Sequence, residues 1–304
     1  MSSEWDNYWS GRDGEQASAA LDGVGVETHT GIASFWDSVF EGLAKDIRLV
    51  DLACGAGTVL RRAGAAGLTN LTGADISSGA IAALATNMPD VTGVVCALPD
   101  TPFTDGQFDV VVSQYGFEYA GAAKAATEIA RLTSCGGQFA ALSHFKDGAI
   151  DKECSGKAAK AQALLGSGFI GAAKNVFAAA FAKDQMAYDA TLKQLAGPQK
   201  IMAELAASGM GLAQHIQAGT AQLFSRLANY TFQDIAGWLD GNESEVKAYL
   251  ARMHAMRRAA LSVEDVAAVN AALEQGGMET AQPAIFAPDG ADKPIAWIIR
   301  ARKP

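Results

Sequence analysis

The sequence predicts an α/β fold in which a mostly parallel sheet of seven strands carries helices on both faces. The main observation is that short apolar runs alternate with segments of helical periodicity over residues 30–145, and that this alternation returns after residue 261. A second observation predicts an all-helical insertion between strands five and six. Residues 150–260 are rich in Ala, Lys and Gln and place their apolar residues at helical spacing.

The strands and helices of the first part can be read in chain order. Strands are expected at the apolar runs 47–53, 71–76, 90–97, 107–114 and 137–144. Helices are expected at 31–44, from Thr58, from Ser77 and over 122–132. The hydroxyl groups of Ser77 and Ser78 are suited to capping a helix, and the segment TSCGG (133–137) is typical of a turn.

The insertion and the C-terminal part carry further boundary signals. Thr231-x-x-Asp234 and Asn242-x-x-Glu245 each predict a helix start, whereas Gly197-Pro198 and Gly209-x-Gly211 predict breaks. Ser262-x-x-Asp265 predicts a helix to about Gly276, followed by extended segments at 278–288 and 294–303. The chain is therefore expected to divide into residues 1–149, 150–260 and 261–304, with the first and last parts forming one core.

Composition and charge limit the kinds of molecule that we expect the protein to bind. The chain has 304 residues, 49% of them hydrophobic, which is enough to bury a large core. Its net charge is −9, and only residues 150–258 are slightly basic, so a nucleic-acid partner is not expected. The polar, acidic N-terminus and the lack of a long uninterrupted apolar run predict a cytoplasmic protein without a membrane partner. The four cysteines form no C-x-x-C pair, and we expect no metal site.

A glycine-rich turn is the strongest local signal. The expected strand that ends at Asp51 is followed by Gly55-x-Gly57 and a helix, and such a turn lets a ligand approach bare backbone at a helix N-terminus. Asp75 closes the next strand, where a carboxylate can accept hydrogen bonds from both hydroxyl groups of a ribose. The alternative is a plain glycine turn beside a solvated aspartate. A dinucleotide fingerprint would place a third glycine where the sequence has Leu60.

These motifs resemble those of a known family. VDLACGAG (50–57) and LTGADIS (71–77) are similar to the first two motifs of class I S-adenosylmethionine-dependent methyltransferases. The resemblance continues through 98–119 and 130–144, and returns at 271–286 and 295–303. It covers about two-thirds of the chain and leaves the insertion out. It implies a Rossmann-like sheet, S-adenosyl-L-methionine as cofactor and methyltransferase activity.

The resemblance also implies roles for single residues. It assigns the methionine end of the cofactor to Asp51 and to the turn, the ribose to Asp75, one face of the adenine to Ile76, and the amino group to Ser113 and Gln114. The expected cofactor-binding residues are Asp51, Ala53, Cys54, Gly55, Gly57, Asp75, Ile76, Ala97, Leu98, Ser113 and Gln114. One departure is that Cys96 and Ala97 stand where the family often has an aspartate that binds the adenine amino group. Backbone groups or Asp100 are then expected to make this contact.

Aromatic residues near the N-terminus are a further candidate. Trp5, Tyr8 and Trp9 lie on one face of an expected helix, which is typical of core packing. Members of the resembled family commonly fold an N-terminal segment over the cofactor, which implies that Tyr8 and Trp9 contact it.

Candidate catalytic residues lie where strands four and five end. Methyl transfer is an in-line displacement that needs a general base only when the acceptor must lose a proton. Tyr115, Glu118 and His144 are the candidates, with Tyr119 beside them. His144 is either a general base or a hydrogen-bonded residue at a strand end, and Glu118 either takes part in catalysis or favours a helix N-terminus.

The acceptor is expected to be a small or medium organic molecule. Strand four ends in Ser113-Gln114-Tyr115-Gly116, without the Asn/Asp-Pro-Pro-aromatic run that the family uses on planar amino groups. The insertion follows strand five and is expected to be a lid over the acceptor. Its aromatic and methionine residues would line the acceptor site, pack the insertion or form a homodimer contact. These residues are Phe169, Phe177, Phe181, Met186, Phe224, Trp238, Met253 and Met256.

Two other functions stay open on the sequence. The chain could bind S-adenosylmethionine or S-adenosylhomocysteine without transferring a methyl group. It could also be a nicotinamide-dependent oxidoreductase, which Leu60 disfavours.

Overall fold

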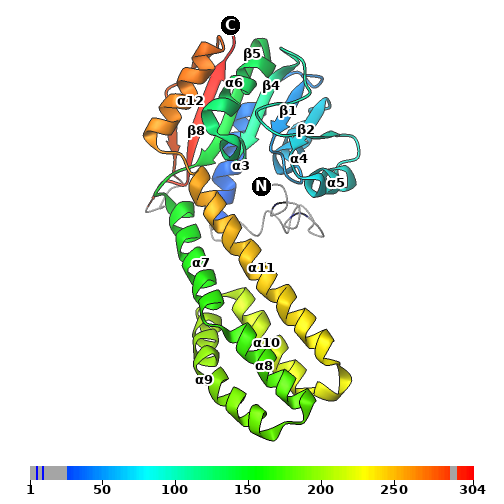
Figure 1. Ribbon diagram of the computed structural model, residues 1–304. Helices are drawn as coiled ribbons and strands as arrows, with labels where there is room; N and C mark the ends of the chain where they lie inside the picture. The colour runs from blue at the N-terminus through cyan, green and yellow to red at the C-terminus, as the bar shows by residue number, and fades with distance from the viewer. Residues whose placement is uncertain (1–4, 6–8, 10–25, 288–292) are drawn as a thin grey trace. The chain divides into compact units, whose positions relative to one another are not determined.

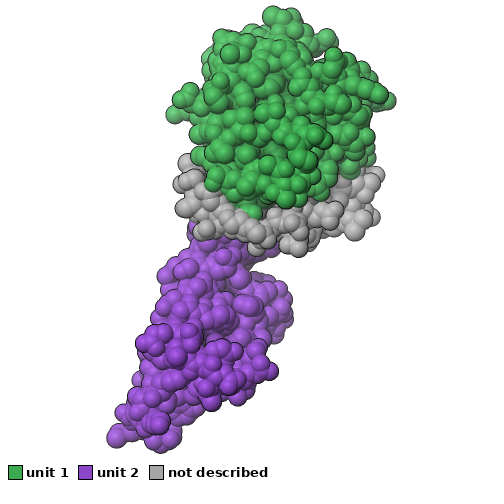
Figure 2. Space-filling model, turned by 90° about the vertical axis from the view of Figure 1, so that its right-hand side faces the viewer, with its two compact units in different colours: residues 1–153, 255–304 green, residues 154–254 purple. Residues whose placement is uncertain are grey.

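The computed structural model describes residue 5, residue 9, residues 26–287 and residues 293–304. The chain divides into two compact units, shown in different colours in Figure 2. Unit 1 comprises Met1–Glu153 and Ala255–Pro304, and unit 2 comprises Cys154–His254. Unit 2 lies within the segment that the sequence marks as a helical insertion, so the insertion folds as a compact unit of its own.

Unit 1 is built on a mixed, mostly parallel sheet, which confirms the expected fold class (Figure 1). Its strands are β1 (Leu49–Leu52), β2 (Leu71–Asp75), β3 (Thr92–Val95), β4 (Phe108–Gln114), β5 (Thr133–His144), β6 (Glu279–Thr280), β7 (Ala284–Phe286) and β8 (Ala296–Arg302). The strand order is β3-β2-β1-β4-β5-β8-β6, and β7 also pairs with β8. Strands β1 to β5 are parallel, whereas β8 runs antiparallel to β5. The carboxyl ends of β1, β2, β4 and β5 therefore meet at one edge of the sheet.

The expected sixth strand is divided into two. β6 and β7 both pair antiparallel with β8, so the sheet has eight strands instead of seven. Pro283 lies between them and has no N–H group to donate to a strand ladder. The Ala281 backbone N–H still donates to the Arg300 carbonyl at 2.9 Å, which keeps the connecting segment beside β8.

Helices cover both faces of the sheet. One face packs against α3 (Val26–Phe40), α4 (Thr58–Ala65) and α5 (Ser78–Asn87), and the other against α6 (Ala122–Leu132) and α12 (Val263–Gln275). Successive strand residues alternate between the two apolar clusters, as Leu49 belongs to the first and Val50 to the second. A short 3₁₀ helix, η1 (Phe117–Ala120), connects β4 to α6.

Local signals define several helix boundaries as expected. α6 begins and ends where the sequence predicts it. The Ser77 hydroxyl accepts a hydrogen bond from the Ala80 backbone N–H at 3.1 Å and caps α5. Ser262 and Asp265 form a reciprocal capping box at the start of α12. The expected turn 133–137 lies within β5, where pairing with β4 is interrupted between Thr133 and Gln138.

The helices of the insertion pack around their own apolar core. They are α7 (Ala149–Gly166), α8 (Phe169–Ala182), α9 (Gln185–Ala207), α10 (Gly211–Ser225), the short η2 (Leu227–Asn229) and α11 (Phe232–Ala259). Fully buried residues such as Val176, Phe177 and Met202 form this core. The stretch Ala149–Ala182 is long and apolar enough to cross a membrane by length and composition. Gly168, in the left-handed conformation, interrupts this stretch between α7 and α8. The apolar residues of α8 pack in the core of unit 2, which explains why α8 is apolar.

Two expected boundaries in the insertion are wrong. α9 continues through Pro198, although proline removes one helical hydrogen bond. Leu195 and Met202 are buried on either side of it, and their packing holds the helix together. α11 continues through Asn242, whose side-chain amide donates to the Trp238 carbonyl at 2.8 Å instead of capping a new helix.

Candidate active site

The glycine turn after β1 is held in a left-handed conformation. Ala53, Gly55 and Gly57 have φ angles of 57°, 52° and 86°. Such angles strain a non-glycine residue such as Ala53. The Cys54 backbone N–H donates to the Ala74 carbonyl at 3.0 Å, which ties the turn to β2. The turn therefore presents backbone at the N-terminus of α4, as the sequence predicts.

Asp75 is fixed beside this turn and does not point into bulk solvent. Its carboxylate is 9% exposed and accepts hydrogen bonds from the backbone N–H groups of Gly55 and Ser77, both at 2.9 Å. The two bonds join the end of β2 to the turn after β1. Asp75 thus lies where a ligand that rests on the turn can be contacted at the same time.

Asp51 is a buried carboxyl group at the end of β1. It is 1% exposed, and its Oδ1 atom has no hydrogen-bond partner among the described residues. Burial raises its pKa well above the ordinary value, and the negative charge of Asp75 adds to this effect. An uncompensated buried carboxyl group next to a bare turn is suited to a ligand that brings positive charge or N–H donors.

Leu60 and Cys54 pack against the sheet. Leu60 is fully buried, and its Cδ1 atom would lie 2.9 Å from a β-carbon placed on Gly73 of β2. The Cys54 sulfur lies at 2.8 Å from the same position, and burial is the main reason that its pKa is raised. Leu60 therefore fills the space of the third glycine of a dinucleotide fingerprint, and Cys54 is a packing residue and not a reactive thiol.

The backbone after β4 is also strained. Tyr115 has a φ angle of 52°, and a β-carbon on the next residue, Gly116, would lie 2.6 Å from the Ala53 side chain. Two non-glycine residues in the left-handed region, Ala53 and Tyr115, thus follow neighbouring strands. Such strain is typical of functional sites.

Glu118 and His144 form a buried pair between η1 and the end of β5. One Glu118 oxygen, Oε1, lies 2.8 Å from His144 Nδ1 and accepts a hydrogen bond from the His144 backbone N–H at 3.0 Å. The side chains are 0% and 3% exposed. Glu118 Oε2 and His144 Nε2 have no partner among the described residues. A carboxylate that orients an imidazole ring in this way is typical of general-base catalysis.

Aromatic rings surround this pair. The ring centres of Tyr115 and Tyr119 lie 4.6 Å and 5.8 Å from that of His144. The Trp5 ring packs edge-on against Tyr119 at 5.5 Å. The Tyr115 hydroxyl is buried without a partner among the described residues, and burial raises its pKa, so it stays neutral. The three candidate catalytic residues, Tyr115, Glu118 and His144, thus come together.

The structure limits what Ser113 can contribute. Its buried hydroxyl donates to the Leu52 carbonyl at 2.7 Å and accepts from the Phe117 backbone N–H at 3.1 Å. The side chain is therefore used within the fold and is not free to bind an amino group. Within the described ranges, the Gln114 side chain makes one hydrogen bond, which its oxygen accepts from the indole N–H of Trp36, so its N–H₂ group is available. Sequence analysis missed Trp36, since nothing local links α3 to the end of β4.

The expected adenine-binding residues follow β2 and β3. Ile76 is 44% exposed although it directly follows the buried Asp75, so it offers an apolar surface beside the expected ribose site. Ala97 is exposed, and its carbonyl accepts from the Asp100 N–H at 3.1 Å in a tight turn. Leu98 is half-buried against the core. The Cys96 backbone N–H donates to the Asp75 carbonyl at 2.9 Å, which places this turn next to Asp75.

Trp9 lies against the glycine turn. A β-carbon on Gly55 would lie 2.6 Å from the indole ring of Trp9, so only glycine leaves room for this contact. Tyr8, the other expected residue of this segment, lies outside the described residues. The contact connects the N-terminal aromatic residues to the turn.

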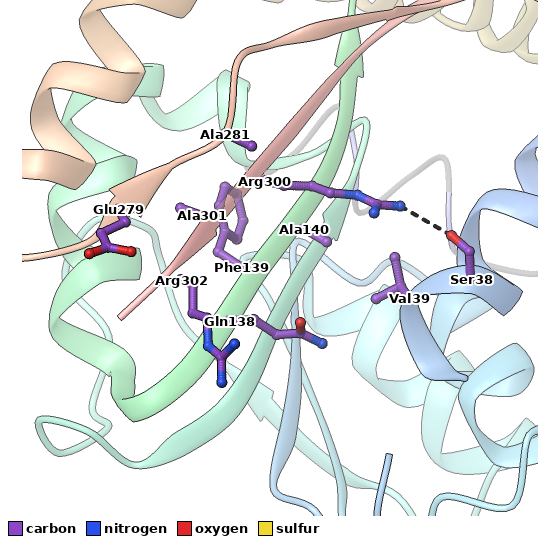
Figure 3. A pocket seen from close by; sticks show the side chains of 10 residues that line it. All are labelled: Ser38, Val39, Gln138, Phe139, Ala140, Glu279, Ala281, Arg300, Ala301 and Arg302. Atoms are coloured by element: carbon purple, nitrogen blue, oxygen red, sulfur yellow. Dashed lines mark hydrogen bonds between the residues drawn. The ribbon is translucent and has the colours of Figure 1, made fainter. Parts of the chain in front are cut away.

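A hollow elsewhere on the sheet is separate from these residues. It has a volume of about 220 Å³ and lies beside the middle of β5 and the end of β8 (Figure 3). Gln138 and Arg302 are cross-strand partners in its wall, and Arg300 donates to the Ser38 hydroxyl at 3.1 Å. Since a strand rises about 3.3 Å per residue, Gln138 lies about 20 Å from His144 along β5.

The aromatic residues of the insertion mainly pack its own core. Phe177 is fully buried and stacks on Phe224 at 4.0 Å, whereas Met186 is 82% exposed. Phe169 and Phe224 also line a groove of about 530 Å³ within unit 2. In the described part of the chain, no group of three or more His, Cys, Asp or Glu residues is placed to hold a metal ion.

Comparison with known proteins identifies the core. Residues 50–141 match the family model described as a methyltransferase domain. Similar solved structures include the YcgJ protein from Bacillus subtilis (18% identity, 39% of this chain and 52% of that chain, TM-score 0.36). They also include geranyl diphosphate C-methyltransferase from Streptomyces coelicolor (21% identity, 39% of this chain and 46% of that chain, TM-score 0.36). An S-adenosylmethionine-dependent methyltransferase from Mesorhizobium loti aligns over 93% of this chain and 100% of its own (14% identity, TM-score 0.47).

This chain spans about half the length of the first two of these structures. No curated protein matches it. The parallel sheet, the left-handed turn after β1 and the carboxylate at the end of β2 are typical of a nucleoside-binding α/β domain. The family-model match over residues 50–141 supports a class I S-adenosylmethionine-dependent methyltransferase domain with S-adenosylmethionine as its cofactor.

Proposed function

We propose that the chain transfers the methyl group of S-adenosylmethionine to a small or medium organic molecule by in-line displacement. The observation that carries this proposal is a convergence of partnerless polar atoms. Of the buried side-chain atoms without a partner among the described residues, five lie at the carboxyl ends of β1, β4 and β5: Asp51 Oδ1, Tyr115 OH, Glu118 Oε2, Ser143 Oγ and His144 Nε2. Buried polar groups are normally satisfied, so this edge is built to receive a ligand.

The residues around the turn fit the cofactor. When bound, it supplies an electrophilic methyl group on a sulfonium. Gly55 and Gly57 allow the left-handed turn at the N-terminus of α4, Asp75 is placed to accept from a ribose, and the buried Asp51 favours a positively charged amino group. On the acceptor side, Glu118 orients His144 as a general base, and the surrounding aromatic rings exclude water.

We further propose that the insertion helps to bind the acceptor. Both of its connections to the core are anchored next to His144. α7 begins at Ala149, shortly after β5 ends at His144, and on the returning side the Leu261 N–H donates to the His144 carbonyl at 2.8 Å. Sequence analysis missed Leu261, whose contact spans the whole insertion. The acidic charge of unit 1 also supports a small-molecule acceptor over a nucleic acid.

Two measurements test the proposed function. Calorimetry with S-adenosylmethionine, S-adenosylhomocysteine and NAD is expected to give binding of the first two only. Incubation of the protein with methyl-labelled cofactor and a mixture of metabolites is expected to move the label into a product. Cofactor binding without any labelled product would favour the alternative, a protein that binds S-adenosylmethionine without methyl transfer.

Cofactor binding is expected to release protons through Asp51. Because its pKa is raised, the Asp51 carboxyl group of the free protein stays protonated at pH values above about 4, where an ordinary aspartate is ionised. Binding of a cationic ligand favours the ionised form, so the carboxyl group releases its proton. Calorimetry at a series of pH values above 4, in buffers of different ionisation enthalpy, should reveal the release. Affinity should rise with pH until Asp51 is ionised in the free protein. Asp51→Asn should remove both effects, and a wild-type signal that is independent of the buffer would contradict the role of Asp51.

Trp9 is expected to contribute to cofactor affinity. Because its ring lies against Gly55, removal of the ring in Trp9→Ala should expose the turn to water and weaken binding of S-adenosylmethionine by about 10-fold. Trp9→Phe, which keeps an aromatic ring, should lose less affinity for S-adenosylmethionine than Trp9→Ala. Equal affinity of wild type and Trp9→Ala in calorimetry would leave Trp9 with a packing role only.

A further inference from the structure

We propose that unit 1 has a second ligand site, which binds the phosphate group of a small phosphate monoester. The site is the hollow beside the middle of β5 and the end of β8, where Arg300, Arg302 and Gln138 are among the lining residues (Figure 3). The hollow is separate from the residues expected to bind the cofactor. This second site therefore goes beyond the proposed function and does not depend on it.

Strand geometry brings the two arginines to one face of the sheet. Arg300 and Arg302 are two residues apart on β8, and alternate residues of a strand point to the same face. Their Cα atoms are about 6.6 Å apart, since a strand rises about 3.3 Å per residue. Gln138 of β5 is the cross-strand partner of Arg302, and Figure 3 shows their side chains next to each other. Two long guanidinium side chains and one amide can thus reach the same small anion.

Contacts with α3 hold Arg300 in place. Its Nη2 atom donates to the Ser38 hydroxyl at 3.1 Å, and its guanidinium carbon lies 5.0 Å from the centre of the Phe35 ring. The Ser38 hydroxyl in turn donates to the Phe35 carbonyl at 2.7 Å. A guanidinium group has five N–H donors, so the hydrogen bond to Ser38 leaves others for a ligand. Arg300 is therefore positioned in the hollow before an anion binds.

The positive charge of the hollow is not neutralised by ion pairs. In the part of the chain that the structure describes, neither Arg300 nor Arg302 forms an ion pair. Glu279, opposite Arg302 on β6, is the acidic residue among the lining residues. Two arginines against one glutamate leave the hollow positive in a chain whose net charge is −9. An anion is thus attracted to this place on an otherwise acidic protein.

The number of donors favours a phosphate ester over a carboxylate. A carboxylate has two oxygens in one plane and occupies one guanidinium fork, which leaves the second arginine unpaired. A phosphate monoester has three charged oxygens and a charge of about −1.5 to −2 at pH 7, which matches two guanidinium groups. The volume of about 220 Å³ equals that of about seven water molecules in the liquid, enough for a phosphate group with a short organic chain.

Calorimetry with glycerol 3-phosphate, inorganic phosphate and succinate tests the site. We expect both phosphates to bind wild type with dissociation constants of about 1 mM or below, and glycerol 3-phosphate to bind at least about 10-fold more tightly than succinate. Succinate supplies two negative charges without a tetrahedral group, so it separates phosphate recognition from simple charge attraction. Low salt is needed, because dissolved ions screen an exposed site.

Substitutions in the hollow should change phosphate affinity in both directions. Arg302→Gln should weaken glycerol 3-phosphate binding by about 10-fold or more, and Arg302→Lys, which keeps the charge without the fork, should lie between. Glu279→Gln should strengthen binding by about 3-fold, because it removes the negative charge of the wall. Arg258→Gln removes an exposed arginine that does not line the hollow, and this matched control should bind as wild type. All four variants should bind S-adenosylmethionine as wild type does.

Chemical modification locates the bound phosphate without any variant. Phenylglyoxal reacts with exposed arginine side chains, and mass spectrometry of the digested protein measures the extent of reaction at each of them. Glycerol 3-phosphate at about ten times its dissociation constant should slow the modification of Arg302 by about 10-fold, because it occupies most of the sites. Arg258 should react at an unchanged rate.

Three results would overturn the phosphate site. They are dissociation constants above about 10 mM for both phosphates, equal weakening by Arg302→Gln and Arg258→Gln, and binding of succinate as tight as that of glycerol 3-phosphate. Each of them would leave the proposed methyl transfer standing. Absence of S-adenosylmethionine binding would instead overturn the proposed function and leave the phosphate site in place.

Discussion

Asp75→Ala is expected to weaken S-adenosylmethionine binding by on the order of 100-fold. A carboxylate that accepts from two ribose hydroxyl groups makes two charge-assisted hydrogen bonds, each worth about 1.5 kcal/mol, and 1.4 kcal/mol corresponds to tenfold in affinity. The substitution also removes the acceptor for the Gly55 backbone N–H, so the turn itself loses an anchor. Calorimetry with wild type and variant measures the difference directly.

Two further variants separate binding from folding. Asp75→Ala leaves the N–H groups of Gly55 and Ser77 without their acceptor, and thermal unfolding will show this cost. Asp75→Asn keeps an accepting oxygen for these groups, so it should fold as wild type and still bind more weakly. Asp90→Ala, at an exposed aspartate after α5, is the control and should bind normally. An unchanged dissociation constant for Asp75→Asn and Asp75→Ala would refute the nucleoside site.

Local signals predicted the backbone conformation of the turn after β1 and the start of α12. The left-handed turn at Gly55 and Gly57 and the capping box at Ser262 depend on residues that are close in sequence. Leu60 is buried as expected, because helical spacing places it toward the sheet. These features can be read from short segments since the backbone conformation and the side chain that satisfies it lie within a few residues of each other.

Contacts between distant segments could not be predicted. Glu118 and His144 are 26 residues apart, and Trp36 and Gln114 are 78 residues apart. Each residue was visible as polar or aromatic, but which partner it meets depends on how β4, β5 and α3 assemble. Tertiary packing also overrides a local rule at Pro198, where buried neighbours keep α9 continuous.

Excision of the insertion is expected to separate cofactor binding from methyl transfer. Neither of the two apolar clusters of unit 1, as described, includes a residue of Cys154–His254, and unit 2 has its own buried core. Asp151 in the first turn of α7 and Arg257 in the last turn of α11 form an ion pair at 3.0 Å. A short Gly/Ser linker can therefore replace residues 154–254 and join the ends without stretching unit 1.

The excised protein should bind S-adenosylmethionine within about 3-fold of wild type, because all expected cofactor-binding residues lie in unit 1. Its turnover of the acceptor should fall by at least about 100-fold, since binding energy from parts of the acceptor away from the reacting atom supports catalysis. Labelled methyl transfer measures this loss, and near-ultraviolet circular dichroism verifies that unit 1 is folded. Full turnover by a folded, excised protein would show that the insertion has no part in acceptor binding, and its exposed residues such as Met186 would then point to a contact with another copy of the chain.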